Sequence, residues 1–312
     1  MFSSHDQIWF QLRVLRGTTS ESALAGLLPI IVVVKQVWAR DGVVGPTRVV
    51  EPETASRLRR ELEDQIAQLP AARTADCLYY KSHLVLGPVD ELAFSPLAIG
   101  LAATLLGPDV LLWDSNVPIK DAGTQKRFTP HQDATYWGLE PPDRAVTVWV
   151  ALTDVGPENG GVQYKLGSHL DGQRLHQTEA RADVMLRRGQ ETAVDPAELI
   201  AIPLAPGEAT AHHPFTVHAS GPNPTSGPRI GVVLVYVASD VTTPGRRDTA
   251  QVVCGGNTGH GFAAEERLST PTSAAALAAH AEAIEAMAGR VIAPPKKDPS
   301  GFVYAHQDSK RL

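Results

Sequence analysis

The segment RAVTVWVALT, residues 144–153, alternates with a period of two, so that apolar side chains fall on one face and Thr147 and Trp149 fall on the other. Such alternation predicts a β-strand. Further short strand patterns cover 43–50, 110–119, 162–166, 204–213 and 230–237. From 110 onward, turn signals such as PENGG at 157–161 and the Gly/Pro/Asn-rich loop at 221–228 separate them. Closely spaced short strands favour an antiparallel sandwich or barrel over a parallel sheet.

Helical patterns flank these strands. A helix is predicted from Pro52 to a stop at Pro70, and another from the cap Ser95 to Gly107. The Ala-rich segment 273–289 predicts a C-terminal helix, whereas the polar segment 174–200 is interpreted as a mobile insertion near the mouth of the barrel. The run Leu27–Val34 is too short to cross a bilayer, and its β-branched content predicts a buried strand.

Composition narrows the function classes. The 312 residues are 43% hydrophobic and 20% charged, which is typical of a globular protein. A formal charge of -6 argues against a nucleic-acid partner. Only two cysteines occur, Cys77 and Cys254, which favours a reducing cytoplasm. No feature requires a membrane, and the sequence leaves the oligomeric state open.

The most informative motif is TPHQD at 129–133, because a second histidine, His218, lies in VHASGPN at 217–223. In a strand, His131 and Asp133 share a face and can bind one metal. Together with His218 they would form the two-histidine, one-carboxylate set of oxygen-activating Fe(II) enzymes. His212 and His213 are alternative ligands at this stage, although their position before Pro214 favours a structural role.

Arg229 precedes the apolar strand 230–237. An arginine that enters a barrel interior needs an anionic partner, because an unpaired buried charge is costly. A bound dicarboxylate would supply one through bidentate pairing.

Several blocks in this order resemble the phytanoyl-CoA dioxygenase family of Fe(II)/2-oxoglutarate-dependent oxygenases. The resemblance covers roughly Gln36 to Phe262 and rests on PHQD at 130–133, WVALTD at 149–154, ENGG at 158–161, GSH at 167–169, HASGPN at 218–223 and Arg229. It implies a mainly β fold, a double-stranded β-helix (a cupin-like jelly roll) with flanking α-helices. The whole chain, 1–312, is then expected to form one oxygenase domain. Its parts would be an N-terminal extension (1–35), a helical flank (36–107), a jelly-roll core (108–262, with the insertion 174–200) and a C-terminal helical segment (263–312).

The resemblance also assigns roles. It selects His131, Asp133 and His218 as iron ligands and places Arg229 and Ser220 at the distal carboxylate of 2-oxoglutarate. Trp149 and Asn116 would line the cosubstrate pocket. Among nearby residues, Tyr136, Trp137 and Phe215 are substrate-contact candidates, with core packing as the alternative.

The implied reaction uses Fe(II), 2-oxoglutarate and O2 to hydroxylate an unactivated C–H bond of a small molecule, with release of succinate and CO2. Related halogenases have a small residue where Asp133 stands, so hydroxylation is expected first; desaturation, cyclisation and epimerisation are alternatives. No basic cluster marks a coenzyme A site. Two other readings remain open, a cupin-like metal enzyme without 2-oxoglutarate and a non-catalytic binding protein.

Overall fold

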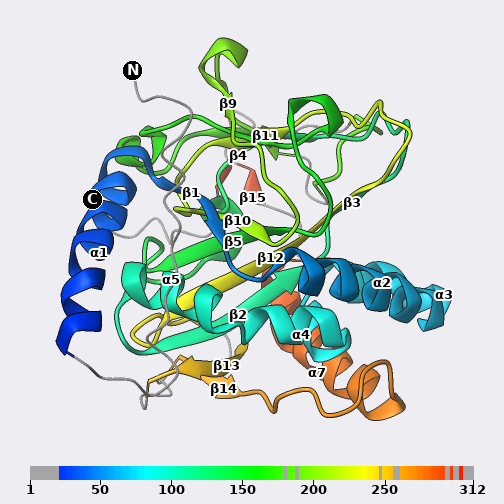
Figure 1. Cartoon of the computed structure of the whole chain (residues 1–312). Coiled ribbons are helices and arrows are strands. Elements are labelled where there is room, and N and C mark those ends of the chain that lie inside the picture. The colour runs from blue at the N-terminus through cyan, green and yellow to red at the C-terminus, as the bar shows by residue number, and fades with distance from the viewer. Residues whose placement is uncertain are drawn as a thin grey trace.

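Two mainly antiparallel sheets form the centre of the fold in this computed structural model (Figure 1). The larger sheet has the strand order β1-β10-β5-β12-β2-β13-β14, with β3 paired to β12. The smaller sheet has the order β4-β11-β6-β9, and a third small sheet has the order β15-β16-β7-β8. The structure describes residues 21–178, 181–186, 190–245, 248–255, 261–291, 296–297 and 302–304.

The strands have the following bounds. In the larger sheet they are β1 Val43–Arg48, β2 Val110–Asn116, β3 Ile119–Lys120, β5 Ala145–Ala151, β10 Glu208–His212, β12 Arg229–Ala238, β13 Asp248–Cys254 and β14 Phe262–Ala264. In the smaller sheet they are β4 Phe128–His131, β6 Val162–Tyr164, β9 Ile200–Ala201 and β11 His218–Ser220. In the third they are β7 His176–Thr178, β8 Gln190–Glu191, β15 Lys296–Lys297 and β16 Phe302–Tyr304.

The predicted alternation of residues 144–153 is confirmed in β5, where every side chain is nevertheless buried. Val146, Val148 and Val150 belong to the main hydrophobic core, whereas Trp149 packs in a second cluster on the other face. Both faces are covered because helix α5 packs against the larger sheet on one side and the smaller sheet lies on the other. The mainly β, jelly-roll-like fold with flanking helices is therefore confirmed.

The helices are α1 Glu21–Asp41, α2 Pro52–Gln68, α3 Ala71–Tyr79, α4 Gly87–Ala93, α5 Pro96–Leu106, α6 Ala134–Trp137 and α7 Ala274–Val291, and the 3-10 turns are η2 Ser82–Leu84, η3 Pro157–Asn159, η4 Ser168–Asp171 and η5 Pro196–Glu198. The predicted helices correspond to α2, α5 and α7. Ser95 occupies the N-cap position of α5, but its hydroxyl donates to the carbonyl of Val49, 2.7 Å away, and does not cap the helix.

The predicted strand at Leu27–Val34 is wrong, because this run lies inside α1. Val34 is buried, while Val32 and Val33 are 50% and 39% exposed. A helix buries only one stripe of its surface, so consecutive β-branched residues need not all point inward. Helix α1 also runs across the boundary between 35 and 36; residues 1–20 of the expected extension lie outside the described residues.

Where the structure describes it, the segment 174–200 forms β7, β8, the 3-10 turn η5 and the first residue of β9. His176 is fully buried and accepts a hydrogen bond from the backbone N–H of Gln132 through its Nε2, at 3.1 Å. Thr192 donates its backbone N–H to the carbonyl of Pro130, at 2.8 Å. These contacts attach the segment to the β4 end of the smaller sheet.

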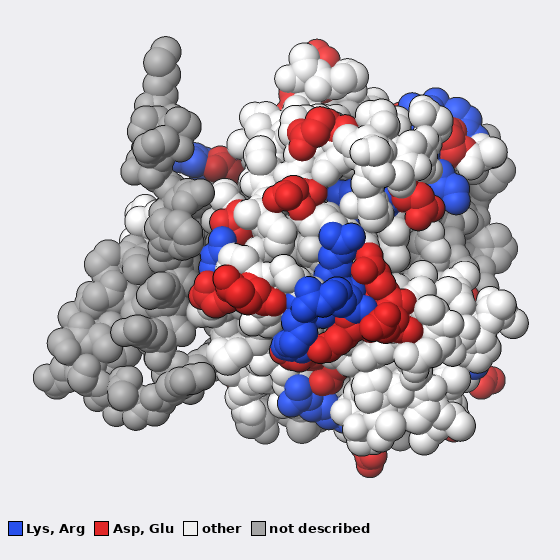
Figure 2. Space-filling view, turned by 45° about the vertical axis from the view of Figure 1, so that its right-hand side comes forward, with Lys and Arg blue, Asp and Glu red and all other residues white. Residues whose placement is uncertain are grey.

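On the face of the molecule shown in Figure 2, basic side chains lie beside acidic ones. Arg57 on α2, for example, pairs with Glu61 and Glu91. None of the described helices is by itself long and apolar enough to cross a membrane. Helices α4 and α5 reach the required length and composition only when they are counted together, and the two are bent by 49° relative to each other.

Candidate metal centre

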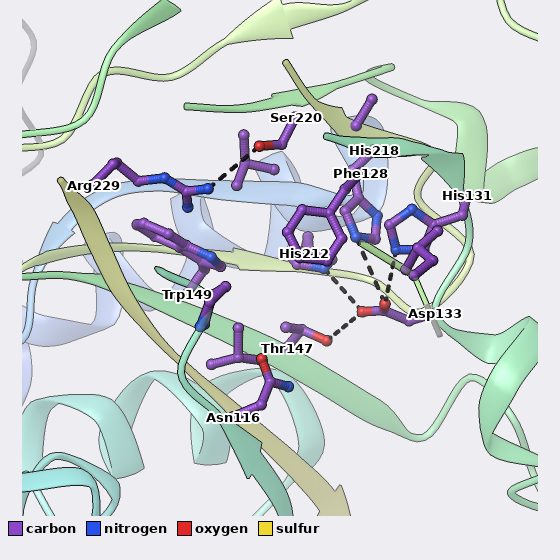
Figure 3. A pocket seen from close by; sticks show the side chains of 15 residues that line it. Asn116, Phe128, His131, Asp133, Thr147, Trp149, His212, His218, Ser220 and Arg229 are labelled. Atoms are coloured by element: carbon purple, nitrogen blue, oxygen red, sulfur yellow. Dashed lines mark hydrogen bonds and ion pairs between the residues drawn. The ribbon is translucent and has the colours of Figure 1, made fainter. Parts of the chain in front are cut away.

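The structure brings His131, Asp133 and His218 together (Figure 3). Strands β4 and β11 are antiparallel neighbours in which His131 and His218 stand directly opposite each other. Their rings are 4.2 Å apart, and Asp133 follows the end of β4. One potential ligand atom from each of the three residues lies within 4.8 Å of the others. Strands β4 and β11 thus supply the two histidines, whereas Asp133 lies beyond the strand expected to carry it, at the N-cap of α6.

Both imidazoles present Nε2 to this centre. His131 Nδ1 donates to the carbonyl of Thr129 at 2.7 Å, and His218 Nδ1 donates to the carbonyl of Thr216 at 3.0 Å. Because a carbonyl only accepts, each Nδ1 carries the proton and each Nε2 keeps its lone pair. The two Nε2 atoms lie 3.7 and 3.6 Å from Oδ1 of Asp133. Backbone carbonyls that fix the tautomer in this way are common around metal-binding histidines.

The other oxygen of Asp133 is held from the larger sheet. Thr147 on β5 donates its hydroxyl to Oδ2 at 2.7 Å, and His212 on β10 donates Nε2–H to the same oxygen at 3.1 Å. His212, an alternative ligand on sequence grounds, therefore contacts Asp133 from outside the three-residue set. Thr147 was not singled out as a site residue, although the alternation of β5 already placed it beside Trp149 on one face.

The charges in the centre suit a divalent cation. Burial lowers the pKa of His131 and lowers that of His218 further, so both stay neutral. Burial would raise the pKa of Asp133, but His218, His212 and His131 together hold it well below its usual range. Two neutral imidazoles and one carboxylate form a donor set that fits Fe(II).

Arg229 begins β12 and is 1% exposed. Burial lowers its pKa to about 10. Its guanidinium lies 5.2 Å from the ring of Trp149 and donates to the hydroxyl of Ser220 at 3.5 Å, while Nε has no partner among the described residues. A buried guanidinium with an unused donor fits a carboxylate ligand.

Lys120 adds a second buried cation that sequence reasoning did not assign to the site. Lys120 stands opposite Arg229 in the antiparallel pair of strands β3 and β12. Its ammonium donates to the hydroxyl and carbonyl of Ser220, at 2.5 and 3.0 Å, and to the carbonyl of Gly221. Burial and the charge of Arg229 lower the pKa of Lys120 to about 7. Two neighbouring cations strengthen the case for an anion at this end of the cavity.

A cavity of about 140 Å³ connects this cationic end to the metal centre (Figure 3). Trp149 and Asn116, both predicted cosubstrate residues, line it together with Arg229 and Ser220. Phe128 and Leu186 also contribute to the wall. Leu186 belongs to the 174–200 segment, so that insertion reaches the cavity.

A second cavity of about 150 Å³ shares His131 and Asp133 with the first. The predicted substrate contacts Tyr136 and Trp137 line this second cavity. Phe215 lines neither of the two; its backbone carbonyl accepts a hydrogen bond from the side chain of Gln132, at 2.6 Å.

Comparison with known proteins shows that the chain is similar to proteins named as dioxygenases or as having a dioxygenase domain. Phytanoyl-CoA dioxygenase domain-containing protein 1 of Danio rerio is 34% identical over 128 residues, which cover 40% of this chain and 43% of that protein. The ectoine dioxygenase of Streptomyces coelicolor is 26% identical over 226 residues, which cover 64% of this chain and 75% of that enzyme. The chain thus spans less than half of the zebrafish protein and three quarters of the ectoine dioxygenase.

Among solved structures, the apo form of the non-heme monooxygenase ThoJ is similar with a TM-score of 0.76 and 31% identity, covering 83% of this chain and 97% of that one. Residues 38–231 match the family model described as phytanoyl-CoA dioxygenase (PhyH), and this range contains all three members of the candidate metal centre and Arg229. The chain therefore belongs to the phytanoyl-CoA dioxygenase family.

Proposed function

We propose that this protein is an Fe(II)/2-oxoglutarate-dependent dioxygenase that hydroxylates an unactivated C–H bond of a small molecule, with release of succinate and CO2. The observation that carries the proposal is one cavity with a two-histidine, one-carboxylate set at one end and a buried guanidinium at the other. Relatives named ectoine dioxygenase and L-proline trans-4-hydroxylase support a small-molecule substrate.

His131, Asp133 and His218 would hold the iron, because their free donor atoms converge and their pKa values keep them in the ligating form. Bound together, ferrous iron and 2-oxoglutarate supply the O2-dependent oxidation that this family uses on C–H bonds. Two histidines and one carboxylate are the donor set that oxygen-activating Fe(II) enzymes use, so these three residues would suffice to hold the ion.

Arg229 and Ser220 would bind the distal carboxylate of 2-oxoglutarate, and Lys120 would add positive charge behind it. Trp149 holds the guanidinium in place from one side, and Asn116 and Phe128 close the wall. A carboxylate in this pocket would receive charge-assisted hydrogen bonds from buried side chains, and such bonds are strong in the protein interior.

Asp133 supports hydroxylation over halogenation, since its carboxylate occupies the position that halogenases of this group leave free for chloride. Desaturation, cyclisation and epimerisation can start from the same chemistry at the substrate, and product analysis by mass spectrometry separates them. We further propose that the chain acts as one oxygenase domain, supported by a cavity whose walls come from residues as far apart in the sequence as Asn116 and Val233. We also propose a cytoplasmic location, supported by the two free cysteines, Cys77 and Cys254, which suit a reducing compartment. A stable core released by limited proteolysis that lacks β12 would contradict the single-domain part.

Anaerobic titration with Fe(II) and then 2-oxoglutarate tests the proposal. We expect a weak visible charge-transfer band and, once a substrate is supplied with air, succinate in step with product. Arg229→Ala should weaken 2-oxoglutarate binding by about 100-fold, because a charge-assisted bidentate pair is lost. Arg144→Ala, which removes an exposed pair with Asp240, is the matched control. An unchanged 2-oxoglutarate affinity in Arg229→Ala would favour a cupin-like enzyme of another type, and no band at all would favour a binding protein.

A further inference from the structure

Gln132 stands between two of the proposed metal ligands, His131 and Asp133, but it lines neither of the two cavities at the metal centre. Its side chain is fully buried. Strand β4 ends at His131 and β11 begins at His218, so the regular pairing of these strands stops at the two histidines. Hydrogen bonds outside the sheet therefore have to fix the chain that follows β4 and the chain that precedes β11.

The side chain of Gln132 bonds two loops at once. Its Nε2 donates to the carbonyl of Phe215, in the loop that leads into β11, at 2.6 Å and to the carbonyl of Gly172 at 2.8 Å. Its Oε1 accepts the backbone N–H of Arg174 at 2.7 Å and a side-chain N–H of Gln173 at 3.2 Å. An amide has two N–H donors and an oxygen with two lone pairs, so these four bonds use its full capacity.

The backbone near Gln132 makes further bonds to the same two loops. The N–H of Gln132 donates to Nε2 of His176 at 3.1 Å, and Nδ1 of His176 donates to the carbonyl of Arg174 at 2.9 Å. The N–H of Ala134 donates to the carbonyl of Pro214 at 3.1 Å. The segment that carries two metal ligands is thus bonded to the loop 172–176 on one side and to the loop 214–215 on the other.

These bonds bear on the ligand atoms through the backbone. The carbonyl of Thr216, the residue after Phe215, accepts Nδ1–H of His218 at 3.0 Å and so sets the direction of that ring. Asp133 has helical backbone angles, φ -60° and ψ -41°, because the chain turns there from β4 into α6. This turn, and not strand alternation, places its carboxylate. A shift of either loop would therefore move a donor atom of the metal set.

We propose that Gln132 is a positioning residue of the metal centre, which holds the segment carrying His131 and Asp133 in place against the loop that leads to His218. This inference rests on the proposed function and concerns the metal set of the same site. Without the amide, two carbonyls and one backbone N–H would lose their partner, and leaving such groups unpaired in the interior is costly. The loops would shift to satisfy them, and the ligand atoms would shift with the loops.

The test uses the full-length chain and Co(II), which replaces Fe(II) and has visible d–d bands that respond to coordination geometry. Gln132→Met exchanges the amide for an apolar side chain of similar length. We expect the affinity for Co(II) to fall by about tenfold or more, as is typical when groups that orient metal ligands are removed, and the d–d bands to change.

Gln251→Met is the matched control. It removes another buried glutamine, on β13, whose Nε2 donates to the carbonyl of Glu266 at 2.9 Å. This variant should be less stable than the wild type but should keep the wild-type affinity for Co(II) and the wild-type spectrum. The comparison separates positioning of the ligands from a general loss of stability.

Wild-type Co(II) affinity and d–d bands in Gln132→Met would overturn the inference. Equal losses of Co(II) affinity in Gln132→Met and Gln251→Met would also overturn it, because lower stability alone would then explain both. If circular dichroism shows that Gln132→Met is unfolded, Gln132→Glu takes its place. It keeps the shape and an acceptor for the N–H of Arg174 but removes both donors, and unchanged Co(II) binding again overturns the inference.

The charge-transfer band with Fe(II) and 2-oxoglutarate distinguishes this inference from the proposed function. A wild type that binds Co(II) but gives no band, together with weaker Co(II) binding by Gln132→Met, would contradict only the proposed function. A normal band in the wild type, together with unchanged Co(II) binding by Gln132→Met, would contradict only this inference. A wild type that does not bind Co(II) would contradict both.

Discussion

The two oxygens of Asp133 face different partners, and this asymmetry governs how the carboxylate can bind a metal. Oδ1 faces His131 and His218, whereas Oδ2 is held by Thr147 and His212. With Oδ2 engaged, only Oδ1 is directed at the metal position. In the proposed site, Asp133 would therefore bind a metal through Oδ1 alone.

Thr147→Val removes one of these hydrogen bonds without changing the side-chain shape. We expect the affinity for Fe(II) to fall by about tenfold, because groups that orient metal ligands typically contribute that much or more. Anaerobic competition with a coloured chelator measures it. Thr104→Val, which removes a hydroxyl bond within α5, should bind iron like the wild type. Equal affinities in the two variants would show that Thr147 does not orient Asp133.

Lys120 should link cosubstrate binding to pH. Its pKa of about 7, lowered by burial and by Arg229, applies to the protein without an anion, and a bound carboxylate would raise it. At a pH between the pKa of Lys120 in the free protein and its higher pKa in the 2-oxoglutarate complex, the complex binds more protons than the free protein does. Binding of 2-oxoglutarate should therefore take up a proton and weaken as pH rises above 7, by up to about tenfold per pH unit.

Calorimetry of the Ni(II)-loaded protein in two buffers of different ionisation enthalpy measures this proton uptake directly. Lys120→Met should abolish it, whereas the exposed Lys126→Met should not. Uptake that persists in Lys120→Met would assign the proton to another group.

For individual residues, the sequence predicted those site residues whose type is unusual for the stretch in which they stand. His131, Asp133 and His218 were recognisable from spacing and resemblance, and Arg229 from a charge at the head of an apolar strand. Lys120 and Thr147 were missed because ordinary residues of these types are usually exposed. Their roles depend on pairings between distant strands, such as β3 with β12, that no local pattern encodes.

Among the elements, β12 positions the cationic end of the cavity and relies on one small residue to do so. An ideal Cβ on Gly231 would lie 2.2 Å from the ring of Trp149, its diagonal neighbour on β5. The absence of a side chain at Gly231 thus lets the indole lie flat beneath Arg229.

Gly231→Ala should push Trp149 toward the cavity. We expect a loss of about 1–3 kcal/mol in the free energy of unfolding, as for other overpacked cores, together with weaker 2-oxoglutarate binding. Denaturant unfolding and anaerobic titration measure the two effects. Gly227→Ala is the matched control, since no atom lies within 4 Å of the added Cβ. If both variants behave alike, the close contact with Trp149 is not important.

The predicted helices and strands were correct where the hydrophobic periodicity agreed with the residues that begin and end an element. Helix α2 has Pro52 at its start and a clear apolar face, and β5 alternates without interruption. The run Leu27–Val34 failed because β-branched content was weighed without periodicity. A helix that rests on the protein surface tolerates exposed valines when one residue per turn, such as Val34, packs inward.

For the whole molecule, the site lies between the two sheets and takes its parts from both. The smaller sheet supplies His131 and His218, and the larger sheet supplies Arg229 and the partners of Asp133. The resemblance predicted a fold of this kind, but only the strand pairing of the structure shows which sheet supplies which site residues. A metal and cosubstrate bound together would therefore cross-link the two layers.

This arrangement predicts that ligands stabilise the entire fold. Ni(II) with 2-oxoglutarate, at 100 times their dissociation constants, should add about 2.7 kcal/mol or more to the free energy of unfolding. For a chain of this size, that corresponds to a rise in Tm of about 5 °C. Differential scanning calorimetry measures the shift, and a chelator should reverse it. His218→Ala should show no shift in Tm, because the variant lacks one of the three proposed metal ligands. His280→Ala is the control: it removes a buried histidine that donates to the carbonyl of Tyr80, so the variant should be less stable than the wild type but should gain the full shift on ligand binding. A wild-type Tm that does not respond to the ligands would mean that the two sheets are not joined through this site.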